Sequence, residues 1–185
     1  MGKDVILRMG DPSDWRHWRA IREMSRSFLE PWEPSWPHNA LDYNFFCGLL
    51  RRSWRDWRQG NAYAFMIFRR TEEGKVGALV GGIALNDIQR GIAQKGTLGY
   101  WIGQPYAQKG YMTEAAGLVC DFAFQTLRLH RVEASCIPTN EPSKSLLRKL
   151  QFEEEGYARA YLQINGAWQD HVLWGKRSLR PQTHV

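Results

Sequence analysis

The chain has 185 residues, of which 43% are hydrophobic and 24% are charged, as expected of a globular protein that buries a sizeable core. It contains neither a run of about 18 apolar residues nor an apolar leader, so membrane spans and secretory signals are not predicted. Lys and Arg outnumber Asp and Glu by 25 to 19, and the net charge of +6 suits an acidic partner or a phosphorylated ligand.

The N-terminal half is divided by helix caps, prolines and glycines. Asp11-Pro12 is a favourable N-cap and first-turn pair, and three prolines in the segment LEPWEPSWP end the helix that follows. Gly60 ends a second helix, and the pair Gly81-Gly82 indicates a bulge or a close backbone approach inside a strand. We therefore expect a strand over residues 5–10, helices over 11–28 and 40–60, and strands over 62–70, 76–85 and 96–103.

The C-terminal half alternates between helical and strand-like patterns. Asn165-Gly166 favours the type I′ turn of a two-residue hairpin. We expect helices over residues 112–127 and 141–150, a strand over 131–137, and hairpin strands over 154–164 and 167–175. This order predicts a single α/β (α+β) domain over residues 1–178, followed by a short tail over residues 179–185.

Two segments carry arginine at a spacing of three to four residues, which places these side chains on helix faces. They are Arg16, Arg19, Arg22 and Arg26 in the first segment, and Arg51, Arg52, Arg55 and Arg58 in the second. A solvated face and a docking surface for RNA both explain the pattern. The three cysteines show no C-x-x-C spacing, so we expect reduced thiols in a cytoplasmic protein and no metal site.

The segment AQKGYMTEA joins a loop glycine to the start of a helix. The first N–H groups of a helix have no intrahelical partner, and the helix dipole adds partial positive charge there. Gly110 permits close approach to the backbone, Lys109 adds a cation, and Thr113 adds a hydroxyl. The predicted ligand is a phosphate or pyrophosphate. The sequence contains neither G-x-x-x-x-G-K-[ST] nor G-x-G-x-x-G, so it lacks the fingerprints of a P-loop and of a dinucleotide site.

This loop resembles the acyl-CoA loop of the GCN5-related N-acetyltransferases (GNAT), whose pattern is Gln or Arg, two residues, Gly, one residue, and Gly or Ala. The window Ala107–Met112 matches at the glycine and departs at its first and last positions. The segments LGYWIGQPYAQKGYMTEA, LHRVEASCIPTNEPSKSLLRKLQFEEEGY and INGAWQDHVLW together resemble the RimJ/RimL branch, the ribosomal-protein N-terminal acetyltransferases. FLEPWEPSWP resembles that branch's N-terminal substrate segment, so the resemblance spans about residues 7–176.

The resemblance implies a mixed, splayed central sheet flanked by helices, with acetyl-CoA as cosubstrate and no metal. It places the pantetheine arm where the strands at 96–103 and 131–137 part, with its amides and the thioester carbonyl near the backbone of Trp101 and Ile102 in an oxyanion-hole role. In the family's Asn-x-x-Ser pattern, Asn140 and Ser143 contact the cofactor. The pyrophosphate would lie on the loop formed by Gln108, Lys109, Gly110, Tyr111, Met112 and Thr113.

Acetyl transfer to an amine needs a neutral amine and a proton donor for the leaving thiolate. An α-amino group has a pKa of about 7.7–8.0, so only modest help from a base is required. The resemblance implies Glu155 as the base and Ser143 as the donor. Glu155 also fits a solvated acidic cluster, and Ser143 a first-turn residue that satisfies backbone groups. Tyr157 and Tyr161 are alternative donors.

Four further residues are candidates for the acceptor groove. Glu30 and Trp32 lie in the proline-rich segment, and Tyr161 and His171 lie in the expected C-terminal hairpin. Asp170 precedes His171 and is placed to orient its ring. Structural roles explain these residues as well.

The sequence thus predicts transfer of an acetyl group from acetyl-CoA to an amine, directly in a ternary complex. The favoured acceptor is the N-terminal α-amino group of a ribosomal protein. Two alternatives stay open: a polyamine, amino acid or drug amine as acceptor, and a non-catalytic acyl-CoA sensor. The sequence is compatible with a monomer or a homodimer and with a position near ribosomal RNA.

Overall fold

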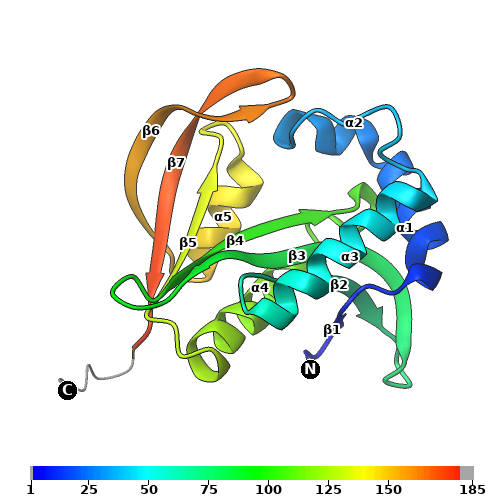
Figure 1. Ribbon diagram of the computed structural model, residues 1–185, viewed down its shortest axis with the longest axis horizontal. Helices are drawn as coiled ribbons and strands as arrows, with labels where there is room; N and C mark the ends of the chain where they lie inside the picture. Colours follow the sequence, from blue (N-terminus) through cyan, green and yellow to red (C-terminus); the bar gives the residue numbers. More distant parts are fainter. Residues whose placement is uncertain (1, 180–185) are drawn as a thin grey trace.

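The computed structural model describes residues 2–179, in which a seven-stranded sheet separates two groups of helices (Figure 1). The strand order is β1-β2-β3-β4-β5-β7-β6, and every neighbouring pair is antiparallel except β4 and β5. The strands are β1 Val5–Arg8, β2 Tyr63–Arg70, β3 Val76–Gln89, β4 Lys95–Ile102, β5 Arg131–Cys136, β6 Glu153–Ile164 and β7 Ala167–Arg177. The predicted mixed α/β sheet is confirmed.

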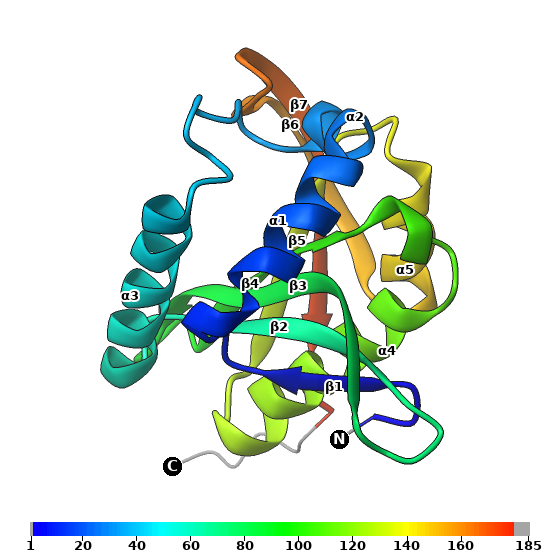
Figure 2. The same ribbon diagram turned by 90° about the vertical axis from the view of Figure 1, so that its right-hand side faces the viewer.

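Helices cover both faces of the sheet because side chains alternate between the faces along each strand (Figure 2). Ile67 of β2 belongs to the core cluster on the side of α4 and α5, and the next residue, Phe68, to the cluster on the side of α1 and α3. The helices are α1 Trp15–Met24, α2 Arg26–Leu29, α3 Tyr43–Gln59, α4 Tyr111–Asp121 and α5 Glu141–Lys149. Among residues 2–179, no helix is long and apolar enough to span a membrane.

The first predicted helix is broken, and tertiary structure explains the break. A 3-10 turn over Pro12–Asp14 precedes α1, and Ser25 separates the end of α1 at Met24 from the start of α2 at Arg26. Ser25 is fully buried, and its Oγ accepts a hydrogen bond of 2.9 Å from the backbone N–H of Gln104, which follows β4. This hydrogen bond holds the residue between the two helices against the end of β4.

The glycine signals read from the sequence are confirmed. Asn165 and Gly166 both have positive φ, 45° and 80°, as a type I′ turn requires. Gly81 lies next to a register shift in the β2–β3 pairing. A Cβ on Gly82 would lie 2.4 Å from Nε1 of Trp101, so this glycine permits the indole to lie against β3.

The parallel strands β4 and β5 pair over only three positions and then part. Their register runs from Lys95 opposite Arg131 to Thr97 opposite Glu133. Beyond these positions β4 continues beside β3 and β5 beside β7, and the two strands diverge in Figure 1. We call the opening between residues 98–102 and 134–136 the wedge. It confirms the predicted splay.

Candidate active site

The loop before α4 has the backbone geometry of an anion site. Gln108 and Gly110 are left-handed, with φ of 60° and 86°, and α4 begins at Tyr111. The N–H of Glu114 donates to the carbonyl of Gly110 at 3.0 Å, so the N–H groups of residues 111–113 precede the first helical hydrogen bond. A Cβ on Gly110 would find no atom within 4 Å. A phosphate therefore has room to reach these donors.

Charged side chains of both signs lie beside this loop. Lys109 forms no ion pair with any residue between 2 and 179, and its Nζ lies 5.9 Å from the ring centre of Tyr106. The carboxylate of Glu114, in the first turn of α4, accepts two hydrogen bonds of 3.0 and 3.1 Å from the backbone N–H of Asp4. A cavity of about 800 Å³ opens here, lined by Asp4, Arg69, Arg70, Thr71, Glu72, Glu73, Lys75, Val76, Lys109 and Tyr111.

A phenol and a hydroxyl meet in the wedge. The Tyr100 hydroxyl on β4 lies 2.7 Å from Oγ of Ser143, in the first turn of α5. Burial raises the pKa of Tyr100 to about 12, so the phenol keeps its proton at neutral pH. Cys136, at the end of β5, is also buried, and burial raises the pKa of its thiol. Tyr100 was not identified as a site residue from the sequence. Its segment, GTLGYWIG, was nevertheless one of the two strands expected to separate.

The backbone of β4 faces the wedge at alternate residues. The N–H of Gly103 donates to the carbonyl of Val80 on β3 at 2.8 Å. By strand alternation, residues 101 and 103 direct their backbone groups toward β3, and residues 100 and 102 toward the wedge. Ile102 is thus placed for the expected backbone role. Trp101 contributes its indole on the side of α1 instead.

Glu155 lies away from the wedge. Its carboxylate accepts hydrogen bonds from both Nη atoms of Arg131, the first residue of β5, one of them at 2.8 Å. Five steps along β5 separate Arg131 from Cys136 at the wedge, or about 16 Å. The hydrogen bonds from Arg131 also lower the pKa of Glu155. This ion pair disfavours Glu155 as the base, because a carboxylate held by a guanidinium is a weaker proton acceptor.

The other candidates have identifiable structural partners. Asn140 caps α5, its Oδ1 accepting from the N–H of Ser143 at 3.1 Å. Glu30 pairs with Arg26 at 2.7 Å. His171 is buried, and its Nδ1 lies 3.0 Å from the carbonyl oxygen of Gln169.

The sequence suggested that Asp170 orients the ring of His171. In the structure the Asp170 carboxylate has other hydrogen-bond partners. It accepts from the Tyr157 hydroxyl at 2.6 Å and from the Ala160 N–H at 2.8 Å. Tyr161 is exposed and packs against the ring of His171, with 5.7 Å between the ring centres. Trp32, which ends a 3-10 turn over Glu30–Trp32, is also solvent-accessible.

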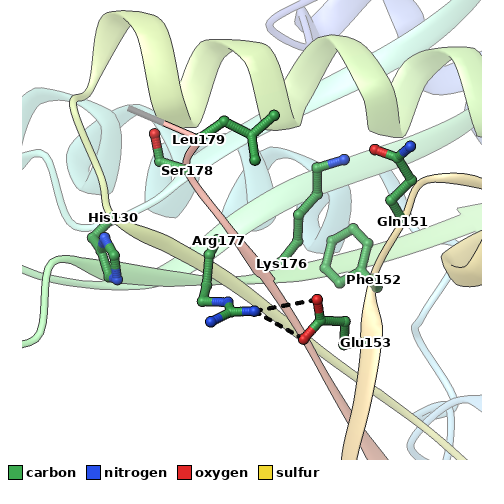
Figure 3. A pocket seen from close by; sticks show the side chains of 8 residues that line it. All are labelled: His130, Gln151, Phe152, Glu153, Lys176, Arg177, Ser178 and Leu179. Atoms are coloured by element: carbon green, nitrogen blue, oxygen red, sulfur yellow. Dashed lines mark hydrogen bonds and ion pairs between the residues drawn. The ribbon is translucent and has the colours of Figure 1, made fainter. Parts of the chain in front are cut away.

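A second cavity, of about 710 Å³, lies at the paired end of β5, opposite the wedge (Figure 3). Glu153 and Arg177 form an ion pair there, with 3.1 Å between Oε2 and Nη2. The cavity is lined by His130, Gln151, Phe152, Glu153, Lys176, Arg177, Ser178 and Leu179. The cavity lies at the opposite end of β5 from the wedge, where the Tyr100 and Ser143 hydroxyls meet.

Within residues 2–179, no group of three or more His, Cys, Asp or Glu side chains is placed to hold a metal ion. Cys47, Cys120 and Cys136 are free thiols, and the latter two are buried. The predicted domain boundary at residue 178 stays a prediction, and residues 180–185 of the predicted tail lie outside the described residues.

Comparison with known proteins identifies the family. The family described as "Acetyltransferase (GNAT) domain" matches residues 4–153. "Probable N-acetyltransferase YjcK" of Bacillus subtilis (strain 168) is 42% identical over 175 residues, 93% of each chain. "[Ribosomal protein uS5]-alanine N-acetyltransferase" of Escherichia coli (strain K12) is 34% identical over 91% of this chain and 84% of that one.

Among solved structures, Mycobacterium smegmatis RimJ in complex with CoA-disulfide superposes with a TM-score of 0.85 at 29% identity. The match covers 94% of this chain and 82% of that one. The chain belongs to the GNAT family and is an acetyl-CoA-dependent N-acetyltransferase.

Proposed function

We propose that this enzyme acetylates the N-terminal α-amino group of a ribosomal protein in the cytoplasm, and that uS5 with an N-terminal alanine is the first acceptor to test. The observation that carries the proposal is the 34% identity to the Escherichia coli uS5-alanine acetyltransferase, which extends over 91% of this chain. Acceptor contacts in such an enzyme must come from parts of the chain outside the anion loop. A match of this length includes the segment after α2 and the turn between β6 and β7.

In this proposal, different residues of the chain have different roles in acetyl transfer. Acetyl-CoA supplies the acetyl group, and the N–H donors of residues 111–113 with Lys109 hold its pyrophosphate. The backbone of Ile102 faces the wedge, where it orients the thioester carbonyl. As the C–N bond forms and the C–S bond breaks, the Tyr100–Ser143 pair delivers a proton to the departing thiolate. The nitrogen of the acceptor loses one proton in the same reaction, and this proton restores the pair. The amine arrives neutral, because its pKa of about 7.7–8.0 leaves a usable neutral fraction near pH 7.5 without a base.

The first experiment measures release of CoA thiol from acetyl-CoA by the purified protein. A decapeptide with the N-terminal sequence of uS5, beginning with alanine, is expected to stimulate release. The same peptide with a blocked N-terminus is the control and is expected to be inert. Faster release with spermidine or free lysine would instead favour a small-amine enzyme. Mass spectrometry of the peptide then shows whether one acetyl group is on the α-amine.

The exposed face of α3 supports a second part of the proposal, contact with ribosomal RNA. Arg51, Arg52 and Arg58 form no ion pair with any residue between 2 and 179, and Arg55 pairs only with Asp56, at 3.2 Å. All four arginines are exposed on neighbouring turns of one helix. Phosphate groups of RNA are attracted to such an array, whose contribution weakens as salt increases.

Charge reversal on α3 tests this contact. The triple variant Arg51→Glu, Arg55→Glu, Arg58→Glu is expected to slow acetylation of uS5 in assembled small ribosomal subunits by about tenfold or more at low salt. Acetylation of the free peptide should not change. The matched triple Lys variant keeps the charge and is expected to retain activity on both. Equal rates for the Glu and Lys variants on subunits would contradict the contact.

A further inference from the structure

A partly buried ion pair lies beside the wedge, and the proposed acetyl transfer makes no use of it. The two Nη atoms of Arg22, on α1, each donate to one carboxylate oxygen of Glu33 at 2.7 Å. The two side chains are only 13% and 18% exposed. Trp36 Nε1 donates to the same carboxylate at 2.8 Å. Desolvation makes such a pair a poor source of stability, so a role in fixing geometry is the better explanation for its presence.

The guanidinium of Arg22 is also held between aromatic rings. Its central carbon lies 4.1 Å from the ring centre of Trp36 and 4.9 Å from that of Trp101. Its Nε is buried and has no hydrogen-bond partner among residues 2–179. The site therefore uses the planar shape and the two-pronged donor geometry of arginine, which lysine does not supply.

Glu33 connects the end of β4 to the β6–β7 hairpin. Through Arg22 its carboxylate is tied to Trp101, near the open end of β4. Its backbone carbonyl accepts a hydrogen bond of 2.9 Å from the N–H of Asn165, in the turn between β6 and β7. Both ribbon views show the segment after α2 beside the tip of this hairpin (Figures 1 and 2).

Helix α1, which carries Arg22, packs closely against the end of β4. A Cβ on Gly103 would lie 2.3 Å from Cδ1 of Ile21, so α1 sits directly on the end of β4. The hydrogen bond from the Gln104 N–H to Ser25 Oγ fixes the end of α1 in the same place. A shift of Glu33 would therefore move the hairpin relative to β4 rather than move α1.

We propose that Arg22, Glu33 and Trp36 form a strut that holds the β6–β7 hairpin at a fixed distance from the open end of β4. These are positioning residues: they set how the acceptor amine reaches the thioester. The proposal rests on acetyl transfer in the wedge and holds for a peptide or a small amine. The strut lies on the α1 side of the sheet and the anion loop leads into α4 on the other, so acetyl-CoA binding should be insensitive to it.

The test combines hydrogen exchange with steady-state kinetics on Arg22→Lys, which keeps the charge and removes the planar fork. Amide exchange in the peptide covering residues 163–168 is expected to accelerate about tenfold, because the Asn165 N–H loses its fixed acceptor. With the uS5 decapeptide, the acceptor KM is expected to rise about tenfold while the KM for acetyl-CoA changes less than twofold. Arg19→Lys, in the exposed pair with Glu23, is the matched control and should change neither quantity.

Trp36→Phe is the second variant if Arg22→Lys fails to fold, because it keeps a six-membered aromatic ring against Arg22 and removes the Nε1–H donor to Glu33 together with the five-membered ring. Unchanged hairpin exchange in a folded variant would overturn the strut. An equal rise of both KM values would also overturn it, because the whole site would then have been disturbed. If the wild-type enzyme does not acetylate the peptide, the proposed acceptor fails and the hydrogen-exchange result still decides the strut.

Discussion

Replacing Gly110 by leucine is expected to weaken acetyl-CoA binding by about two orders of magnitude or more while the fold is retained. Gly110 has φ of 86°, which a leucine adopts only with strain, and its Cβ would project into open space at the start of α4. That space adjoins the N–H groups of residues 111–113. Loss of one or two charge-assisted hydrogen bonds, at about 1.5–3 kcal/mol each, weakens binding by about 100-fold or more. Isothermal titration calorimetry with acetyl-CoA measures the effect.

Gly91 provides a matched control for backbone strain. It lies between β3 and β4 with φ of 64°, and a Cβ added there would have no atom within 4 Å. Gly91→Leu therefore carries a similar conformational cost without a ligand nearby. Both variants should lower the melting temperature by a similar amount, and only Gly110→Leu should lose affinity. Wild-type affinity in Gly110→Leu would exclude the loop as the pyrophosphate site.

The second large effect is expected at the Tyr100–Ser143 pair. Tyr100→Phe and Ser143→Ala should each lower kcat by about 100-fold, in the range observed for loss of a proton donor, with little change in acetyl-CoA affinity. Because the pKa of Tyr100 is about 12, the donor stays protonated over the working range. Wild-type kcat/KM should rise with pH as the acceptor amine loses its proton, and then level off without a descending limb below about pH 10.

Two variants separate this assignment from its alternatives. Tyr157→Phe removes an exposed hydroxyl that donates to Asp170 on the hairpin, and it should retain most of its activity. Glu155→Gln should also retain most of it, because its partner Arg131 lies at the paired end of β5. A larger loss of kcat in Tyr157→Phe than in Tyr100→Phe would move the donor to the hairpin. A large loss in Glu155→Gln would restore the carboxylate as the base.

Features decided by neighbouring residues were predictable from the sequence. The hairpin turn at Asn165-Gly166, the helix end at Gly60 and the anion loop at Gly110 depend on backbone angles that few residues other than glycine adopt readily. Strand and helix order follows from the period of the apolar residues, which alternate along strands and recur every three to four positions along helices. The splayed sheet and the cosubstrate were predicted from the resemblance of several long segments to the GNAT family.

Features decided by contacts between distant residues required the tertiary structure. Tyr100 and Ser143 are 43 positions apart, and only the parting of β4 from β5 and the cap of α5 bring their hydroxyls together. The same holds for Glu155, whose partner Arg131 comes from another strand. Whether a polar side chain faces solvent, a partner or substrate depends on what the fold places beside it. Sequence spacing determines which element carries a residue; the packing of those elements decides its chemistry.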